Sequence, residues 1–215
     1  ICNTPLNERF SNSQRTTQAT RAFDPKEYLS EPISTIRADH RQILSFLISN
    51  RAMDRETLEM MSPFVLATKH KNPDGYHHAY SPANVGFPMY RFNKAGVLES
   101  EICGYELKNL NQKYQAIGSD TVNGFWYATQ AKLHAVRNIY FFESALDAMS
   151  FVALKKNGFD INRDMVVSTS GEPKKAQIEA IRNACIIAKP YACFDKDPAG
   201  IRDALLLNDY WTGQG

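Results

Sequence analysis

Three short apolar runs alternate with helical patterns in the second half of the chain. The runs NIYFF (138–142), MVVS (165–168) and YACF (191–194) have the length and composition of buried strands. Segments with apolar residues at helical spacing follow them, over 145–156, 174–184 and 198 to about 210. Strands that alternate with helices predict βαβ units around a parallel sheet. We therefore expect an α/β fold in this half, with helices flanking the sheet.

The first half has a different pattern. Apolar residues at helical spacing predict a helix from a cap at Ser34 or Thr35 to about Asn50, and Asp54 is expected to cap a short helix that ends near Pro63. Period-two patterns over 85–109 predict a β-hairpin or meander, and those over 113–128 predict another strand pair. The hairpin turn is expected at Asn93–Gly96. This half is therefore expected to be α+β.

The ends of the chain and the change of pattern suggest a division into domains. Residues 1–30 are rich in polar side chains and predict a loose arm or linker without a core. We expect an α+β subdomain over 31–135 and an α/β domain over 136–215. The missing initiator Met and the end shortly after the last predicted helix suggest a piece of a longer protein, cut short at its C-terminus.

Composition narrows the classes of function. The 215 residues are 43% hydrophobic and 22% charged, which is ordinary for a globular protein with a packed core. No apolar run approaches the roughly 20 residues that span a bilayer, and no secretory signal is recognisable. The four cysteines form no C-x-x-C pair, so neither a zinc ribbon nor a disulfide framework is expected. We expect a cytoplasmic protein without a membrane partner.

Carboxylates follow two of the predicted strands. Glu143 comes directly after IYFF, and Asp195 comes directly after YACF, with Asp197 two residues on. Functional groups collect beyond the carboxyl ends of parallel strands, so these side chains are expected at one edge, with Asp147 one helical turn after Glu143. Crowded carboxylates favour a hard cation such as Mg²⁺. A structural reading also stands, because Asp197 before Pro198 has the pattern of a helix cap.

These residues resemble a known family. The segments IYFFESALDAMSFVALKKNGFD, MVVSTSGEPKKAQIEAIR and YACFDKDPAG look like the Toprim domain, a Rossmann-like domain of primases, topoisomerases and some nucleases. The resemblance implies Mg²⁺, with Mn²⁺ as a substitute, bound by Asp195 and Asp197, with Glu143 as a ligand or acid/base group. Ser144 stands where bacterial-type primases usually have Gly.

The first half extends the resemblance towards primases. FLISNRAMDRETLEMM, the strands of 85–109 and QKYQAIGSDTVNGFWYA resemble the DNA primase catalytic core, most closely that of primase-like Toprim proteins of bacterial mobile elements. Lys113 matches the Lys of a Lys-Tyr pair in that family. With Tyr114, Lys108 and Arg91 it forms the predicted nucleic-acid or nucleotide contact, since cations suit phosphates and aromatic rings suit bases. The alternative is that these strand aromatics serve only packing and that the cations are merely solvated.

Histidine and cysteine suggest no further chemistry. His77 and His78 would point in opposite directions on an extended chain, and no Cys lies near them or His70 in the sequence. We expect no zinc in this chain. Cys103, Cys185 and Cys193 are expected to be small buried residues rather than nucleophiles.

The function that follows from the resemblance is primase-like primer synthesis. It implies Mg²⁺-dependent nucleotidyl transfer on single-stranded DNA, with nucleoside triphosphates as substrates and a helicase as a candidate partner in replication or mobilisation. Two alternatives stay open. One is a Toprim-type nuclease, and the other is a non-catalytic nucleic-acid-binding module.

Overall fold

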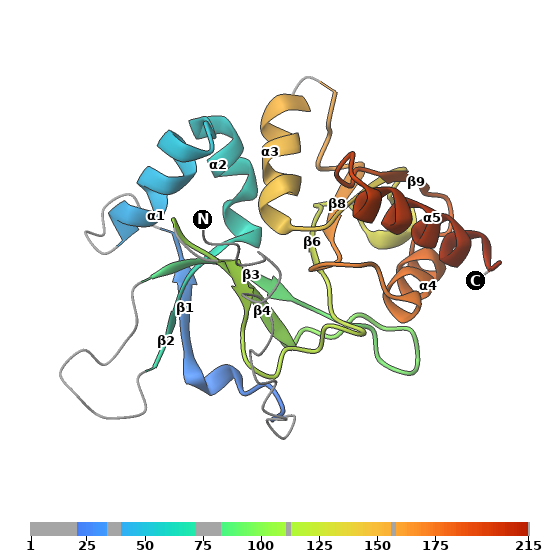
Figure 1. Cartoon of the computed structure of the whole chain (residues 1–215), viewed down its shortest axis with the longest axis horizontal. Coiled ribbons are helices and arrows are strands. Elements are labelled where there is room, and N and C mark those ends of the chain that lie inside the picture. Colours follow the sequence, from blue (N-terminus) through green and yellow to red (C-terminus); the bar gives the residue numbers. More distant parts are fainter. Residues whose placement is uncertain (1–20, 34–39, 72–82, 111–112, 156–157, 215) are drawn as a thin grey trace, which may run out of the picture.

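The computed structural model describes residues 21–33, 40–71, 83–110, 113–155 and 158–214, and it contains two β-sheets (Figure 1). The elements of the first half are η1 (Pro25–Glu27), β1 (Tyr28–Pro32), α1 (Arg41–Ser45), η3 (Phe46–Asn50), α2 (Arg55–Met61), η4 (Ser62–Phe64), β2 (Leu66–His70), β3 (Asn84–Met89), β4 (Gly104–Lys108) and β5 (Lys113–Gln115). Those of the second half are β6 (Trp126–Ala128), η5 (Leu133–Ala135), β7 (Asn138–Phe142), α3 (Ala145–Lys155), β8 (Asp164–Ser168), α4 (Lys175–Ala184), β9 (Lys189–Ala192) and α5 (Pro198–Thr212).

The first sheet is antiparallel throughout, in the order β1-β2-β3-β4-β5. The predicted turn closes as expected, because the Gly96 amide donates to the Asn93 carbonyl at 2.9 Å. Asp54 caps α2 by accepting from the Thr57 amide at 2.9 Å. Helices α1 and α2 lie over this sheet on the same side of the molecule as α3 (Figure 1). The expected α+β character and both of these local signals are thus confirmed.

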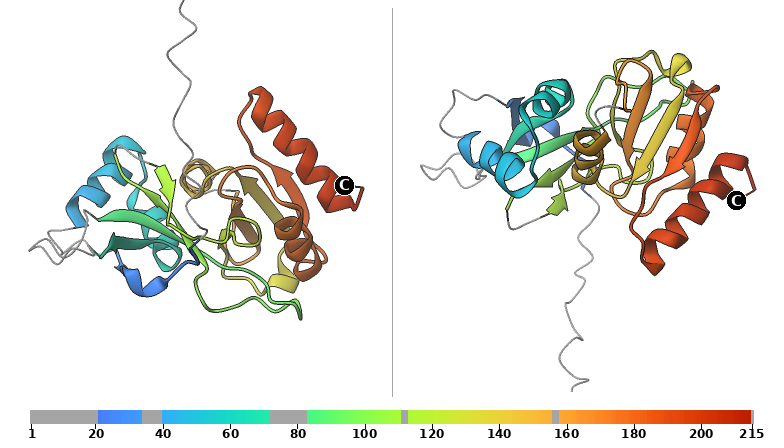
Figure 2. Two further views of the ribbon diagram at one scale, coloured as in Figure 1. Left: turned by 60° about the horizontal axis from the view of Figure 1, so that its bottom comes forward. Right: turned by 90° about the horizontal axis from the view of Figure 1, so that it is seen from above.

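The second sheet has the order β6-β8-β7-β9, with β7, β8 and β9 parallel. Side chains alternate along its central strand. Ile139 and Phe141 of β7 pack in the core under α4 and α5, whereas Phe142 belongs to the core that contains α3. The helices therefore cover both faces of a mostly parallel sheet (Figure 2), which confirms the α/β class.

One core joins the two halves of the chain. Phe46 and Met61 from the first half share an apolar cluster with Leu146 and Met149 of α3. The Trp126 indole, fully buried, donates to the Phe64 carbonyl at 2.8 Å. These contacts fix the first sheet against the second and so place residues of β4 and β5 beside the carboxyl end of β7.

The structure corrects the expectation for the N-terminal arm. Residues 21–30 carry η1 and the start of β1, although their polar composition predicts a loose arm without a core. Tyr28 is buried, with its ring 5.5 Å from that of Tyr105 and 5.6 Å from that of Phe23. Aromatic packing therefore orders the end of this polar segment. Residues 1–20 and the predicted caps Ser34 and Thr35 lie outside the described residues.

The predicted strand pair within 113–128 is also wrong. The strand β5 pairs with β4 at the edge of the first sheet, whereas β6 runs antiparallel to β8 in the second. The exposed Lys113–Gln115 suits an edge, and the buried Trp126 and Ala128 suit a core. The second sheet therefore takes one strand from the segment before the predicted division at 135/136, a division that stays a prediction.

Two further features belong to the fold. The last strand begins earlier than expected, at Lys189 rather than Tyr191, because Pro190 is tolerated in an edge strand. Within the described part of the chain, no helix is both long enough and apolar enough to pass through a bilayer.

Candidate functional site at the carboxyl ends of the second sheet

The parallel pairing brings the predicted acidic residues to one edge of the second sheet. Glu143 directly follows β7, and β9 is the parallel neighbour of β7. Asp195 stands three residues after the end of β9 rather than directly after it, because Cys193 and Phe194 continue beyond the strand. Glu143 and Asp195 are exposed. The expectation that they share an edge is therefore confirmed.

The segment between Asp195 and Gly200 is a tight turn into α5. The Gly200 amide donates to Oδ1 of Asp197 at 2.8 Å, and Pro198 occupies the first helical position, so the predicted cap is present. A Cβ atom at Gly200 would lie 2.0 Å from the Asp195 carbonyl oxygen. Only glycine allows this approach, which explains why the pattern D-x-D is followed by Gly and how the turn positions Asp195.

The carboxylates do not gather into a metal-binding group. In the described ranges, no three His, Cys, Asp or Glu side chains come close enough to hold a metal ion. Three of the four have a local partner instead: Asp197 accepts the cap bond, Asp147 Oδ2 accepts from the Ser144 hydroxyl at 2.5 Å, and Glu143 Oε1 lies 3.7 Å from Lys113 Nζ. The expected convergence within reach of one ion is therefore not seen, and the roles of Glu143, Asp147, Asp195 and Asp197 as ligands stay predictions.

The chemistry of the donors nevertheless fits a hard cation. Asp203 of α5 is 4% exposed, and its Oδ1 has no hydrogen-bond partner. The Arg202 guanidinium lies beside it, with Nε 3.9 Å from that oxygen. Burial raises the pKa of the Asp203 carboxyl, Arg202 opposes the shift, and the charges of Glu172 and Glu143 add to it. An orphaned carboxylate oxygen in the field of two other carboxylates suits Mg²⁺, which prefers oxygen ligands.

Cations of the first sheet face this acidic edge. Lys108 and Lys113 are directly opposite each other on β4 and β5. Partial burial lowers the pKa of the Lys108 ammonium, and the charges of Arg51 and Lys113 lower it further. Like charges in direct cross-strand register destabilise a sheet, and the charges of Asp147 and Glu106 offset part of this repulsion at Lys108. Lys113 thus lies between a second lysine and Glu143.

The other two predicted contacts are placed differently. Tyr114 follows Lys113 on an extended strand, so its side chain points to the other face of the sheet, where it hydrogen-bonds to Asn84. Arg91 donates from Nε to Glu99 at 2.8 Å and from its terminal nitrogen to Asp120 at 3.1 Å. These bonds raise the pKa of its guanidinium. Arg91 would have to give up two carboxylates before it could contact a phosphate.

Glu106 is a residue of the site that the sequence reading missed. It is 2% exposed on β4 and accepts hydrogen bonds from the Ser168 hydroxyl at 2.9 Å, the Ser170 hydroxyl at 3.2 Å and the Ala145 amide at 3.1 Å. Its signal in the sequence is a charged residue inside the otherwise buried strand GYELK. Such a residue is rarely buried unless it has partners, which only the tertiary structure supplies.

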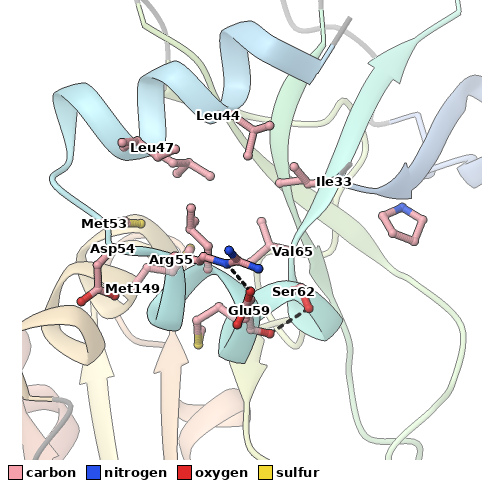
Figure 3. A pocket seen from close by; sticks show the side chains of 14 residues that line it. Ile33, Leu44, Leu47, Met53, Asp54, Arg55, Glu59, Ser62, Val65 and Met149 are labelled. Atoms are coloured by element: carbon pink, nitrogen blue, oxygen red, sulfur yellow. Dashed lines mark hydrogen bonds and ion pairs between the residues drawn. The ribbon is translucent and has the colours of Figure 1, made fainter. Parts of the chain in front are cut away.

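Neither the cysteines nor a large pocket contributes to this site. Burial raises the pKa of the Cys103 and Cys185 thiols to about 12, as expected for inert residues. A mostly apolar pocket of about 940 Å³ lies between α1, α2 and α3 (Figure 3). Leu44, Leu47 and Met149 are among its lining residues, and none of the predicted site residues is. His70 ends β2, and His77 and His78 lie outside the described residues.

Of the comparisons with known proteins, the match to a family model bears on the second half of the chain. Residues 140–213 match a family model described as Toprim-like. No curated protein matches the chain. Among solved structures, the primase fragment of the bacteriophage T7 primase-helicase protein aligns at 12% identity and a TM-score of 0.48, over 91% of this chain and 67% of that one. A chain of a bacteriophage T7 lagging-strand DNA polymerase complex with primase domains, an RNA/DNA hybrid and dTTP aligns at 13% identity and a TM-score of 0.49, over 87% of this chain and 79% of that one.

Proposed function

We propose that this chain is a primase-like nucleotidyltransferase core that joins nucleoside triphosphates on single-stranded DNA with Mg²⁺, or Mn²⁺ in its place. One observation carries the proposal. The ammonium of Lys113, on the first sheet, lies 3.7 Å from the carboxylate of Glu143, on the second. Nucleotidyl transfer needs cations for the phosphates beside carboxylates for the metal, and this is where the two sets meet.

The roles follow from the chemistry of each group. Asp195 and Asp197 would hold Mg²⁺, with Glu143 as a further ligand or an acid/base group and Asp147 close to it on the same edge. The ion, when bound, supplies charge stabilisation for the phosphates. Lys113 and Lys108 would bind the phosphates of the template or the nucleotide, and Tyr114 would offer a face for stacking from the other side of β5. A helicase partner in replication or mobilisation belongs to the same proposal.

Two other functions use the same residues and are separated by the products. A Toprim-type nuclease would activate water with the same ion and cleave DNA, and a binding module would do neither. The test measures three quantities on one single-stranded template: incorporation of labelled ribonucleotides, cleavage of the template, and affinity for the template with and without Mg²⁺.

The proposal predicts template-dependent incorporation that requires Mg²⁺ or Mn²⁺ and is lost in Asp195→Asn. The matched control is Asp209→Asn, which changes a carboxylate of the same region near the other end of α5. Cleavage without incorporation would establish the nuclease instead. Affinity that is indifferent to Mg²⁺ and to loss of Glu143, Asp195 and Asp197, without either reaction, would establish the binding module.

A further inference from the structure

Glu106 reaches from the first sheet to the start of α3, just after Glu143, and to the end of β8. Its Oε1 accepts from the amide of Ala145, two residues after Glu143, at 3.1 Å. Its Oε2 accepts from the hydroxyls of Ser168 and Ser170, at the end of β8 and just beyond it. The turn after β8 is itself tied to Glu143, because the Gly171 amide donates to the Glu143 carbonyl at 2.9 Å.

The turn after β8 is held in an unusual conformation. Ser170 has φ 56, in the left-handed region that residues other than glycine rarely adopt. Its hydroxyl bonds to Glu106, and its carbonyl accepts from the side-chain amide of Gln115 on β5 at 2.6 Å. Both partners come from the first sheet. Strain of this kind persists only where the surroundings fix it, which here is done by β4 and β5.

Glu106 and Lys113 are diagonal neighbours on one face of β4 and β5, since Glu106 is opposite Gln115 and Lys108 is opposite Lys113. Burial raises the pKa of the Glu106 carboxyl, and among the groups that oppose this rise the Lys113 ammonium has the largest influence. The same ammonium lies 3.7 Å from Glu143. Lys113 therefore stands in the field of two carboxylates, one buried and one open to solvent.

We propose that Glu106 is a positioning residue, which fixes the backbone around Glu143 and shares the Lys113 ammonium with it, so that the Glu143 carboxylate can accept a divalent cation. The inference rests on the proposed function and adds a residue that touches neither metal nor substrate. If the charge of Glu106 is removed, the Lys113 ammonium interacts with Glu143 alone and competes with the cation. Weaker cation binding should then depend on the presence of Lys113.

A double-mutant cycle on Mn²⁺ binding tests this dependence. Free Mn²⁺ is measured by electron paramagnetic resonance in the wild type, Glu106→Gln, Lys113→Met and the double variant. Glu106→Gln should raise the Kd for Mn²⁺ by about fivefold, which corresponds to the free energy of a partly exposed ion pair such as Lys113–Glu143. The same change in the Lys113→Met background should leave the Kd within about twofold. Equal weakening in both backgrounds would overturn the sharing of Lys113 and leave only a structural role.

Two further measurements keep the inference testable. Ser168→Ala removes one hydrogen bond to Glu106 but keeps its charge, so its Kd should stay near that of the wild type; a fivefold rise would contradict the role of the charge. In Glu106→Ala, exchange of the Ala145 amide should accelerate at least about tenfold relative to that of Ile139, in the centre of β7. If this ratio does not change, Glu106 does not position the turn.

Failure of this inference and failure of the proposed function give different results. Wild-type protein that binds no Mn²⁺ at this edge would refute the metal site of the proposed function, and the exchange of Ala145 would still decide whether Glu106 fixes the turn. Mn²⁺ binding with no dependence of the Glu106 effect on Lys113 would refute the sharing of Lys113 and leave the proposed function intact. If Glu106→Ala does not fold, the Ser168→Ala and Lys113→Met variants carry the test. Lys113→Met alone should strengthen Mn²⁺ binding. A weaker affinity for Mn²⁺ in this variant would contradict the competition between the Lys113 ammonium and the cation for Glu143.

Discussion

Replacing Asp203 by alanine should make the protein more stable. Asp203 occupies the buried stripe of α5 with Gly200 and Leu207, yet its Oδ1 has no hydrogen-bond partner. A buried polar group left unsatisfied costs about 1–3 kcal/mol, and alanine adds up to about 0.7 kcal/mol of helix propensity. The change loses the contact with the Arg202 guanidinium, 3.9 Å away and 60% exposed, which contributes at most about 1 kcal/mol.

The expected net gain for Asp203→Ala is about 1–2 kcal/mol, or a rise in Tm of about 2–8 °C, at neutral pH. Thermal unfolding by circular dichroism, without divalent cations, measures it. Asn208→Ala, on the exposed side of the same helix, is the control for helix propensity alone.

Because the pKa of Asp203 is raised on folding, the folded protein binds its proton more tightly than the unfolded chain does. The penalty is therefore fully present above the folded pKa, and the advantage of Asp203→Ala should shrink as the pH falls towards 4. A variant less stable than the wild type at pH 7 would refute the reading of Asp203 as an unsatisfied group.

Three further outcomes follow from the same geometry. Lys113→Ala should weaken binding to single-stranded DNA and lower the slope of log K against log salt concentration by about 0.7, the contribution of one phosphate contact. Arg91→Ala should leave this slope unchanged in a fluorescence anisotropy titration, because its guanidinium is already paired with two carboxylates. Equal slopes for the wild type and both variants would contradict the assignment of Lys113. Gly200→Ala should lower the free energy of unfolding by more than the roughly 1 kcal/mol that replacing a glycine ordinarily costs, because its Cβ would overlap the Asp195 carbonyl. The control is Gly213→Ala, where φ is 78 and no such overlap occurs, and urea unfolding measures both variants. Mg²⁺ at about 100 times its Kd should stabilise the wild type by about 2.7 kcal/mol, and unchanged Tm values on addition of Mg²⁺ would argue against a metal site at this edge.

The sequence pattern was most informative where a local signal coincides with the fold. The apolar run of β7 and the helical spacing of α3 predict a βαβ unit with parallel strands, and β7 is parallel to both β8 and β9 in the structure. The helix cap at Asp197 could be predicted because Asp followed by Pro is common at the N-terminus of a helix, with Asp as the N-cap and Pro at the first helical position. Because parallel strands end at the same edge of a sheet, Glu143 and Asp195 could be placed at one edge without coordinates.

Residues that act across the two halves could not be found in this way. The role of Glu106 depends on hydroxyls of Ser168 and Ser170, about 60 residues further along the chain, and no local pattern records that proximity. The opposition of Lys108 and Lys113 depends on the register of β4 and β5. Conversely, the alternation of Arg91 with aromatic residues in the sequence says nothing of the two carboxylates that pair with its guanidinium.

The central claim is that lysines of the first sheet and carboxylates of the second form one site for nucleotidyl transfer. It is tested most directly by incorporation of labelled ribonucleotides on a single-stranded template with Mn²⁺, for the wild type, Lys113→Ala and Asp195→Asn in parallel. The account predicts incorporation by the wild type and a loss of at least about 100-fold in each variant, of the size seen when one charge-stabilising group is removed from an active site. Incorporation that survives both substitutions would contradict it.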